Sequence, residues 1–213
     1  MFKTALIIVD PQNDFCPCGS LAVNEGNKII PIINNLRDYL TTKYNTIVCI
    51  TQDWHPKDHV SFHENNPGST MFQPHTLENG IEQMMWPVHC VQDSDGAKFH
   101  NDLITYESDQ IFQKGCKSSV DSYSGFGSPD LIEENTKLLG YLYKLGVDRV
   151  VIVGLATDYC VKATALHAVK YKYTTYLVLN ACRGVDPKTT ENAIEEMRNA
   201  GVIIVHDQSE LFN

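Results

Sequence analysis

The sequence predicts an α/β protein in three layers, with a parallel sheet between two layers of helices. Three observations support this: the chain contains nearly continuous apolar runs, helical patterns lie between them, and the two kinds of segment alternate. Apolar runs without a period of two are typical of strands buried on both faces of a parallel sheet. Alternating strands and helices favour parallel crossover connections. A length of 213 residues is ample for one core, so we expect residues 1–213 to form a single domain.

The expected strands are short runs rich in Val and Ile. The strongest candidates are residues 4–10 (TALIIVD), 46–51 (TIVCIT), 149–154 (RVVIVG), 174–180 (TTYLVLN) and 201–207 (GVIIVHD). Residues 109–115 (DQIFQKG) form a weaker candidate because polar residues interrupt the run.

The expected helices show apolar residues at intervals of three and four. The four patterns are Ile29, Ile30, Ile33, Leu36 and Leu40; Leu131, Leu138, Leu139, Leu142 and Leu145, ended by Gly146; Val161, Ala165, Ala168 and Val169; and Ala193, Ile194 and Met197, opened by Pro187 and ended by Gly201. Residues 52–108 show no clear period, and a loop region of that length is usually functional.

The composition excludes several functional classes. The hydrophobic fraction of 43% and the charged fraction of 20% are typical of a soluble globular protein. A formal charge of −9 argues against a nucleic-acid partner, which requires clustered Lys and Arg. The apolar stretch near the start is too short for a signal peptide, and none approaches the roughly 20 residues of a membrane span. We therefore expect a cytoplasmic protein with no membrane partner, whose seven cysteines are free thiols.

One set of reactive side chains follows the ends of three expected strands. Asp10, Lys114 and Cys160 would meet at the carboxyl edge of the sheet, where ligands bind in such folds. Thr157 or Asp158 can cap the next helix, which would place Cys160 in its first turn. The helix dipole and Lys114 should then lower the pKa of the thiol. Asp10 could accept the thiol proton and deliver it to a leaving group.

A second set predicts a metal centre. Asp53 and His55 are two residues apart and point to one side of an extended segment, and His89 comes from a separate loop. One carboxylate and two imidazoles can bind a divalent transition metal and leave positions open. His59 could be a fourth ligand or could support a ligand. The alternative is that these are surface histidines of a polar loop.

Motifs spread over nearly the whole chain together resemble one enzyme family. They are ALIIVDPQNDF, GSLAV, TQDWHPKDHVSF, WPVHCV, FQKG, DSYSGF and VGLATDYCVKATALHA, in that order. This combination is similar to that of the nicotinamidases of the isochorismatase-like cysteine hydrolases. The resemblance implies a six-stranded parallel sheet flanked by helices. It also implies an amidohydrolase that converts nicotinamide to nicotinate and ammonia, accepts pyrazinamide, and serves NAD salvage.

The resemblance further implies roles for individual residues. The catalytic residues would be Asp10, Lys114 and Cys160, with Cys160 forming a thioester, and the metal ligands would be Asp53, His55 and His89. The aromatic walls of the substrate pocket would be Phe15, Trp86 and Tyr123. The metal would hold the pyridine nitrogen of the substrate; zinc is the first expectation, and iron and manganese are alternatives. A homo-oligomer is expected because most such enzymes form one.

The family also carries a cis peptide before the alanine of ATDYC, which is the Leu155–Ala156 bond here. By resemblance, this bond would aim the backbone N–H groups of Ala156 and Cys160 at a developing oxyanion.

Other readings of the same residues predict different behaviour. Amidases that act on N-carbamoyl or small aliphatic amides, and isochorismatase proper, generally lack the Asp-x-His cluster and second histidine seen here. A non-haem iron oxygenase uses two histidines and a carboxylate, but it would leave Cys160 and Lys114 without a role. A non-catalytic metal-binding module would bind metal without an unusually reactive thiol.

Overall fold

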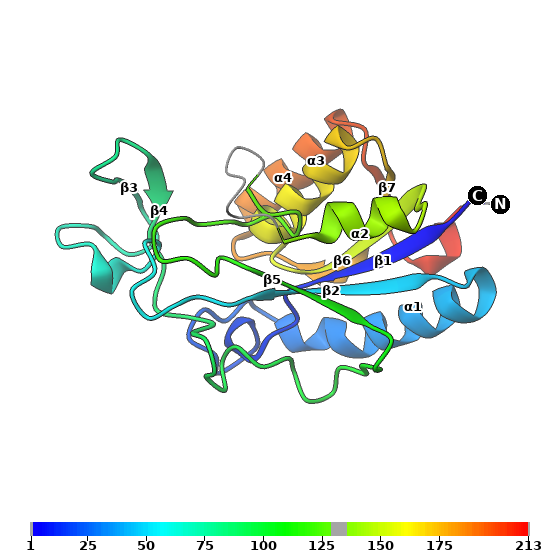
Figure 1. The fold of residues 1–213 in the computed structure, drawn as a ribbon, viewed down its shortest axis with the longest axis horizontal. Coiled ribbons are helices and arrows are strands. Elements are labelled where there is room, and N and C mark those ends of the chain that lie inside the picture. Colours follow the sequence, from blue (N-terminus) through cyan, green and yellow to red (C-terminus); the bar gives the residue numbers. More distant parts are fainter. Residues whose placement is uncertain (1, 129–135, 213) are drawn as a thin grey trace.

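A six-stranded parallel sheet lies at the centre of the computed structural model, which describes residues 2–128 and 136–212 (Figure 1). The spatial order of the strands is β5-β2-β1-β6-β7-β8, and every pair in this sheet is parallel. The strands are β1 (Thr4–Val9), β2 (Ile47–Asp53), β5 (Gln110–Lys114), β6 (Arg149–Leu155), β7 (Thr174–Arg183) and β8 (Ile203–Val205). The predicted fold class is thereby confirmed.

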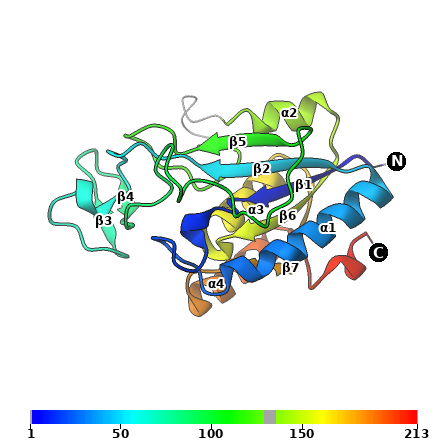
Figure 2. The same cartoon turned by 90° about the horizontal axis from the view of Figure 1, so that it is seen from below.

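Helices cover both faces of this sheet. They are α1 (Ile29–Tyr44), α2 (Leu138–Lys144), α3 (Lys162–Lys170) and α4 (Pro187–Asn199). Figures 1 and 2 show α1 on one face and α2, α3 and α4 on the other. The predicted helix around Leu138 is α2, whereas Leu131 lies outside the described residues.

The burial of the strands explains which of them the sequence predicted strongly. Every residue of β1 is buried, and β6 is buried from its second residue onward. By contrast, β5 is an edge strand in which Gln110, Ile111 and Gln113 are exposed. A half-exposed edge strand has polar residues within its apolar run, and this is why its signal was weaker.

The long region between β2 and β5 holds a small hairpin that the sequence did not predict. The strands β3 (Pro74–Thr76) and β4 (Glu82–Met84) pair antiparallel. Both strands are only three residues long, and their one buried residue is the polar Gln83, so they carry no hydrophobic period. Figure 1 shows the hairpin beyond the carboxyl ends of β2 and β5.

The start of the helix after β6 differs from the prediction. A π-helical turn (Thr157–Val161) precedes α3, and its N-cap residue, Ala156, makes no side-chain cap hydrogen bond. The expectation that Thr157 or Asp158 caps this helix is therefore wrong. Asp158 instead accepts hydrogen bonds from the backbone N–H of Val185 at 2.9 Å and of Asp186 at 3.2 Å, which ties the turn to the start of α4.

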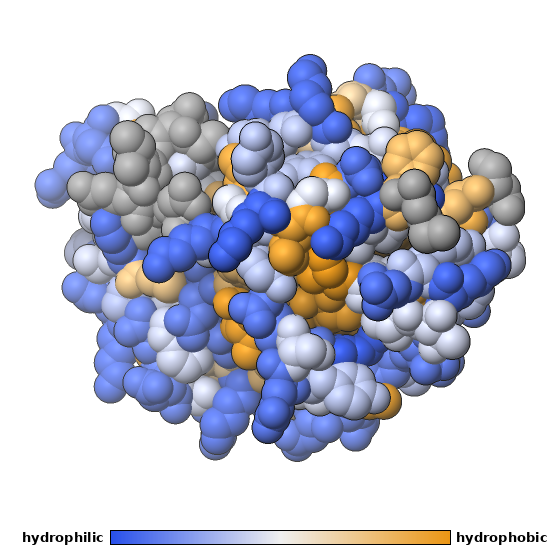
Figure 3. Space-filling model, turned by 45° about the vertical axis from the view of Figure 1, so that its right-hand side comes forward, coloured by the Kyte–Doolittle hydropathy of each residue, from blue (hydrophilic) through white to orange (hydrophobic). Residues whose placement is uncertain are grey.

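The surface seen in Figure 3 is largely hydrophilic, with hydrophobic side chains gathered near the centre of that face. Within residues 2–128 and 136–212, no helix combines the length and the apolar character needed to cross a membrane.

Candidate active site

The side chains of interest lie at the carboxyl ends of four neighbouring strands. Asp10 follows β1, Asp53 and Lys114 end β2 and β5, and Cys160 lies in the turn after β6. Asp53 and Lys114 are direct partners in the register of β2 and β5. Gly154 permits the close approach of β6 to β1, because a Cβ atom there would lie 2.1 Å from the carbonyl oxygen of Val9.

Lys114 is at the centre of a buried polar cluster. Its Nζ donates to the Sγ of Cys160 at 3.3 Å and to the carbonyl oxygen of Ser122 at 3.2 Å, and it lies 3.0 Å from Oδ2 of Asp10. It also forms a buried ion pair with Asp53. A carboxylate oxygen of Asp10 lies within 4.8 Å of the Cys160 Sγ. The thiol, a carboxylate and a cation are therefore held together out of water.

A threonine on β2 fixes the orientation of Asp10. The Oγ1 atom of Thr51 donates to Oδ1 of Asp10 at 2.6 Å and accepts from the backbone N–H of Asp10 at 3.2 Å. Burial raises the pKa of Asp10 to about 6, although Lys114 acts in the opposite direction. The carboxyl group therefore changes its protonation state close to neutral pH, as a general base must.

The thiol of Cys160 differs from the expectation of a lowered pKa. Burial raises the pKa of Cys160 well above its usual value, and the ammonium of Lys114 offsets this only in part. The reason is that Lys114 is shared with Asp10 and Asp53, whose negative charges disfavour a third anion beside them. The resting group is therefore a thiol, and its proton must be removed as it reacts.

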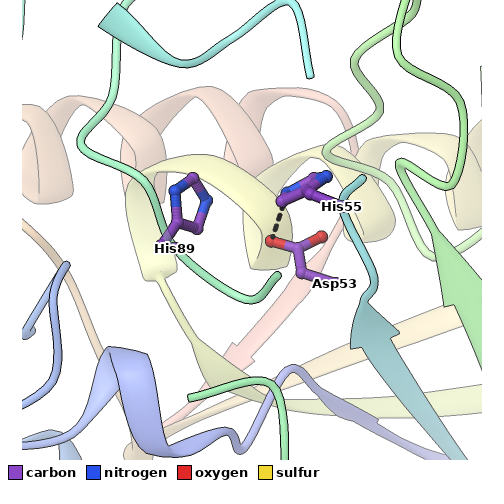
Figure 4. A group of neighbouring side chains, drawn as sticks. All are labelled: Asp53, His55 and His89. Atoms are coloured by element: carbon purple, nitrogen blue, oxygen red, sulfur yellow. Dashed lines mark ion pairs between the residues drawn. The ribbon is translucent and has the colours of Figure 1, made fainter. Parts of the chain in front are cut away.

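Asp53, His55 and His89 offer ligand atoms that lie within 4.8 Å of one another, and Figure 4 shows their side chains facing a common centre. The Nδ1 atom of His55 lies 2.9 Å from the carbonyl oxygen of Gly115, and that of His89 lies 2.7 Å from the carbonyl oxygen of Pro87. A carbonyl oxygen only accepts, so each Nδ1 carries the hydrogen and each Nε2 keeps a free lone pair. This donor set fits a divalent transition metal.

The charge state of these residues also suits a metal. Burial lowers the pKa of His89 to about 4, so its ring is neutral at pH 7. Burial acts the same way on His55, but the carboxylate of Asp53 outweighs it and raises the pKa of His55. Although burial opposes it, Lys114 holds the pKa of Asp53 below its usual range. A cation bound here would meet one carboxylate, and its binding would compete with protonation of His55.

His59 is not part of this ligand group. Its Nε2 lies 3.1 Å from the carbonyl oxygen of Val120, and its Nδ1 lies 2.7 Å from the hydroxyl oxygen of Ser61. Because both ring nitrogens have protein partners, neither is available to a metal. The ring instead packs on His55, with 4.1 Å between the ring centroids.

A pocket with about 400 Å³ of empty space is lined by both Cys160 and the group of Asp53, His55 and His89. Its lining is mainly aromatic and apolar, and consists of Phe15, Leu21, Asp53, His55, Trp86, His89, Asp121, Tyr123, Ala156, Tyr159, Cys160 and Val185. Phe15, Trp86 and Tyr123, which were expected to line a substrate pocket, are among these lining residues. The indole N–H of Trp86 donates to the Tyr123 hydroxyl at 3.0 Å, which fixes the positions of these two side chains.

The peptide bond between Leu155 and Ala156 is cis, as the resemblance implied.

Sequence reasoning missed several residues that build this site. The Oε1 atom of Gln12 accepts from the backbone N–H of Asp53, and its Nε2 donates to the carbonyl oxygen of Asp53, both at 2.8 Å. Thr51 orients Asp10, and Asp121 and Tyr159 line the pocket. Gln12 lies two residues after Asp10 and Thr51 two residues before Asp53, but nothing in their spacing distinguishes them from ordinary polar residues.

Comparisons with known proteins agree with this geometry. A model of the isochorismatase domain family matches residues 4–209. The nicotinamidase of Acinetobacter baylyi is 43% identical over 199 residues, which cover 93% of this chain and 90% of that protein. A solved nicotinamidase and pyrazinamidase from Acinetobacter baumannii has a TM-score of 0.90 and 40% identity, with 99% of each chain covered. The pyrazinamidase of Pyrococcus horikoshii, solved in complex with zinc, has a TM-score of 0.79 and 38% identity, with 95% of this chain and 98% of that chain covered.

Proposed function

The chain is an amidohydrolase that belongs to the nicotinamidases of the isochorismatase domain family, and we propose that it hydrolyses nicotinamide to nicotinate and ammonia through a thioester on Cys160. Pyrazinamide, which has the same flat ring and amide, is the second proposed substrate. The observation that supports this best is that one aromatic pocket contains the buried thiol at one position and the three-ligand group at another.

In this proposal, Asp53, His55 and His89 would hold a divalent metal ion, which would supply a coordination position for the pyridine nitrogen and so help to orient the ring. Zinc is the proposed metal, because the ligand set suits it and the Pyrococcus horikoshii relative was solved with zinc. The aromatic walls Phe15, Trp86 and Tyr123 bury the faces of the ring. Substrate held at both ends would place its amide carbon in front of Cys160.

Acylation begins when the Cys160 sulfur attacks the amide carbon and Asp10 accepts the thiol proton. Lys114, within hydrogen-bonding distance of the sulfur, stabilises the negative charge as the proton leaves. The backbone N–H groups of Ala156 and Cys160 are proposed to stabilise the oxyanion. The C–N bond then breaks, Asp10 donates its proton to the departing nitrogen, and ammonia leaves behind a nicotinoyl thioester.

Deacylation uses the same groups in the reverse order. Water attacks the thioester carbon, and Asp10 accepts a proton from this water. The C–S bond breaks, the proton returns to the sulfur of Cys160, and nicotinic acid leaves and ionises to nicotinate. Asp10 suits both steps because its pKa of about 6 lets it exchange a proton near neutral pH. The net reaction consumes one amide and one water, and supplies nicotinate to a reaction that builds pyridine nucleotides.

The direct test is ammonia release from nicotinamide by the purified protein, with metal analysis of the same sample. The expected result is turnover of nicotinamide and pyrazinamide, and close to one divalent metal ion per chain. An N-carbamoyl amide and a small aliphatic amide serve as comparison substrates. Preferential hydrolysis of either would contradict the proposal, as would oxygen consumption in place of ammonia release.

A further inference from the structure

One carboxylate in the pocket has no part in the steps above. Asp121 comes from the loop between Lys114 and Tyr123 and lines the same pocket as Cys160. One of its carboxylate oxygens lies within 4.8 Å of ring nitrogens of His55 and His59. A negative group this close to a metal centre influences that centre even without touching the ion.

Asp121 lies beside the ligand set rather than within it. The three ligand atoms that converge belong to Asp53, His55 and His89, and Asp121 converges only with His55 and His59. His59 cannot complete a second metal group, since both of its ring nitrogens have protein partners. The position of Asp121 is therefore that of a residue that supports the metal ligands.

The carboxylate of Asp121 is held in place and still has acceptor capacity. The Nε2 atom of Gln83, on β4, donates to Oδ2 at 2.7 Å, and the backbone N–H of Ser122 donates to Oδ1 at 2.8 Å. Gln83 is itself buried, so its amide is a fixed donor. A carboxylate offers about four acceptor sites, and these two bonds occupy two of them, while Asp121 itself lines the pocket.

We propose that Asp121 is a positioning residue for the metal: its carboxylate accepts a hydrogen bond from solvent carried on the open side of the ion, and Gln83 holds the carboxylate there. This proposal rests on the proposed function, because it assumes the metal bound by Asp53, His55 and His89. Water on a divalent cation is a strong donor, and an anionic oxygen is the best acceptor for it. The unpredicted hairpin thereby gains a role, since β4 supplies the residue that fixes Asp121.

The test measures zinc affinity rather than turnover. Metal-stripped wild type and variants are titrated with zinc against a competing chromophoric chelator. Loss of a residue that supports metal ligands typically weakens affinity about 10- to 100-fold, and we expect this for Asp121→Asn. The matched control is Asp58→Asn, which removes an exposed carboxylate between His55 and His59 in the chain and should leave zinc affinity unchanged.

The absorption spectrum of the cobalt-substituted protein separates a supporting residue from a direct ligand. Asp121→Asn should keep the wild-type cobalt spectrum, because the three protein ligands are unchanged, whereas His89→Ala should alter it. A spectrum for Asp121→Asn that changes as His89→Ala does would show that Asp121 binds the ion itself. That result, or a zinc affinity equal to that of wild type, would overturn the proposal.

A second variant tests the role of Gln83 and decides the matter if Asp121→Asn does not fold. Gln83→Met removes the side-chain donor but keeps the length of the side chain, and it should weaken zinc binding to a smaller extent. The double variant should bind zinc no more weakly than Asp121→Asn alone, because both changes act through one carboxylate. Full zinc affinity in Gln83→Met would overturn the assignment of Gln83. Nicotinamide hydrolysis by wild type, and the zinc affinity of His89→Ala, test the proposed function separately.

Discussion

Asp53 and Lys114 form a buried ion pair that joins the proposed metal ligands to the proposed nucleophile, Cys160. They are direct partners in the pairing of β2 with β5. From this pair, Oδ2 of Asp53 lies 3.6 Å from Nε2 of His55, and Nζ of Lys114 lies 3.3 Å from Sγ of Cys160. The two groups of residues come from different segments of the chain. The ion pair couples the charges of the two groups. Substitutions at different proposed metal ligands should therefore differ in their effect on the reactivity of the Cys160 thiol.

The first prediction compares two metal ligands. His89→Ala should weaken zinc binding and hydrolysis but leave the alkylation rate of Cys160 in metal-free protein unchanged, since no hydrogen bond or ion pair connects His89 to Lys114 within the described residues. Asp53→Asn should weaken zinc binding and also change the alkylation rate, because it removes a charge in contact with Lys114. The measurement is iodoacetamide labelling of Cys160, followed by peptide mass spectrometry. Equal labelling rates in the two variants would contradict the shared role of Asp53.

The second prediction concerns Lys114. Lys114→Met leaves Asp10 and Asp53 buried without their cation, and breaking such a pair typically costs about 3–5 kcal/mol of unfolding free energy. Because a nearby cation favours the thiolate, the pH midpoint of Cys160 alkylation should also rise. Urea unfolding and the pH dependence of labelling measure the two effects. Lys162→Met is the control, as Lys162 forms an ion pair with Glu196 on the surface. An unchanged labelling midpoint would remove Lys114 from its proposed role.

The third prediction concerns the acid limb of the pH profile. Hydrolysis needs ionised Asp10, so kcat/KM should rise with pH through about 6, the pKa of this buried carboxyl group. Thr51→Val removes a hydrogen bond that stabilises the carboxylate, so the pKa of Asp10 should rise and the acid limb should move to higher pH. Thr46→Val is the matched control at the other end of β2, where Thr46 bonds the carbonyl oxygen of Leu40. A limb that stays in place in Thr51→Val would contradict the assignment of this limb to Asp10.

The fourth prediction concerns the resting thiol. Burial raises the pKa of Cys160, so at pH 7 it should react with iodoacetamide more slowly than the exposed Cys18 and Cys116. Peptide mass spectrometry after limited labelling gives the order of reaction. Labelling of Cys160 first would instead support a thiolate in the resting enzyme.

Much of the fold could be predicted from the sequence because its main strands are buried on both faces. β1 and β6 therefore appear as continuous apolar runs. The hairpin of β3 and β4 could not be predicted, since its strands of three residues have no apolar period. The cap at Thr157 or Asp158 was predicted wrongly because a side chain beside a helix start can bond elsewhere, as Asp158 does with the backbone N–H of Val185.

In the candidate site, residue positions were easier to predict than their energetics. The ends of parallel strands meet at one edge, which is why Asp10, Lys114 and Cys160 could be placed together. The predicted direction of the pKa shift of Cys160 was wrong, because this shift depends on burial and on the sharing of Lys114 between two carboxylates. Asp121 was missed because its importance comes from its approach to His55, which chain spacing does not reveal.

The central claim is that Cys160 is the acylated nucleophile, and acid quenching of the enzyme during nicotinamide turnover tests it most directly. Peptide mass spectrometry of the quenched protein should find a nicotinoyl group on the peptide that contains Cys160, and Cys160→Ala should fold, carry no adduct and lose turnover by several orders of magnitude. A nicotinoyl group on Cys116 in place of Cys160, or substantial hydrolysis by Cys160→Ala without any thioester, would contradict the account.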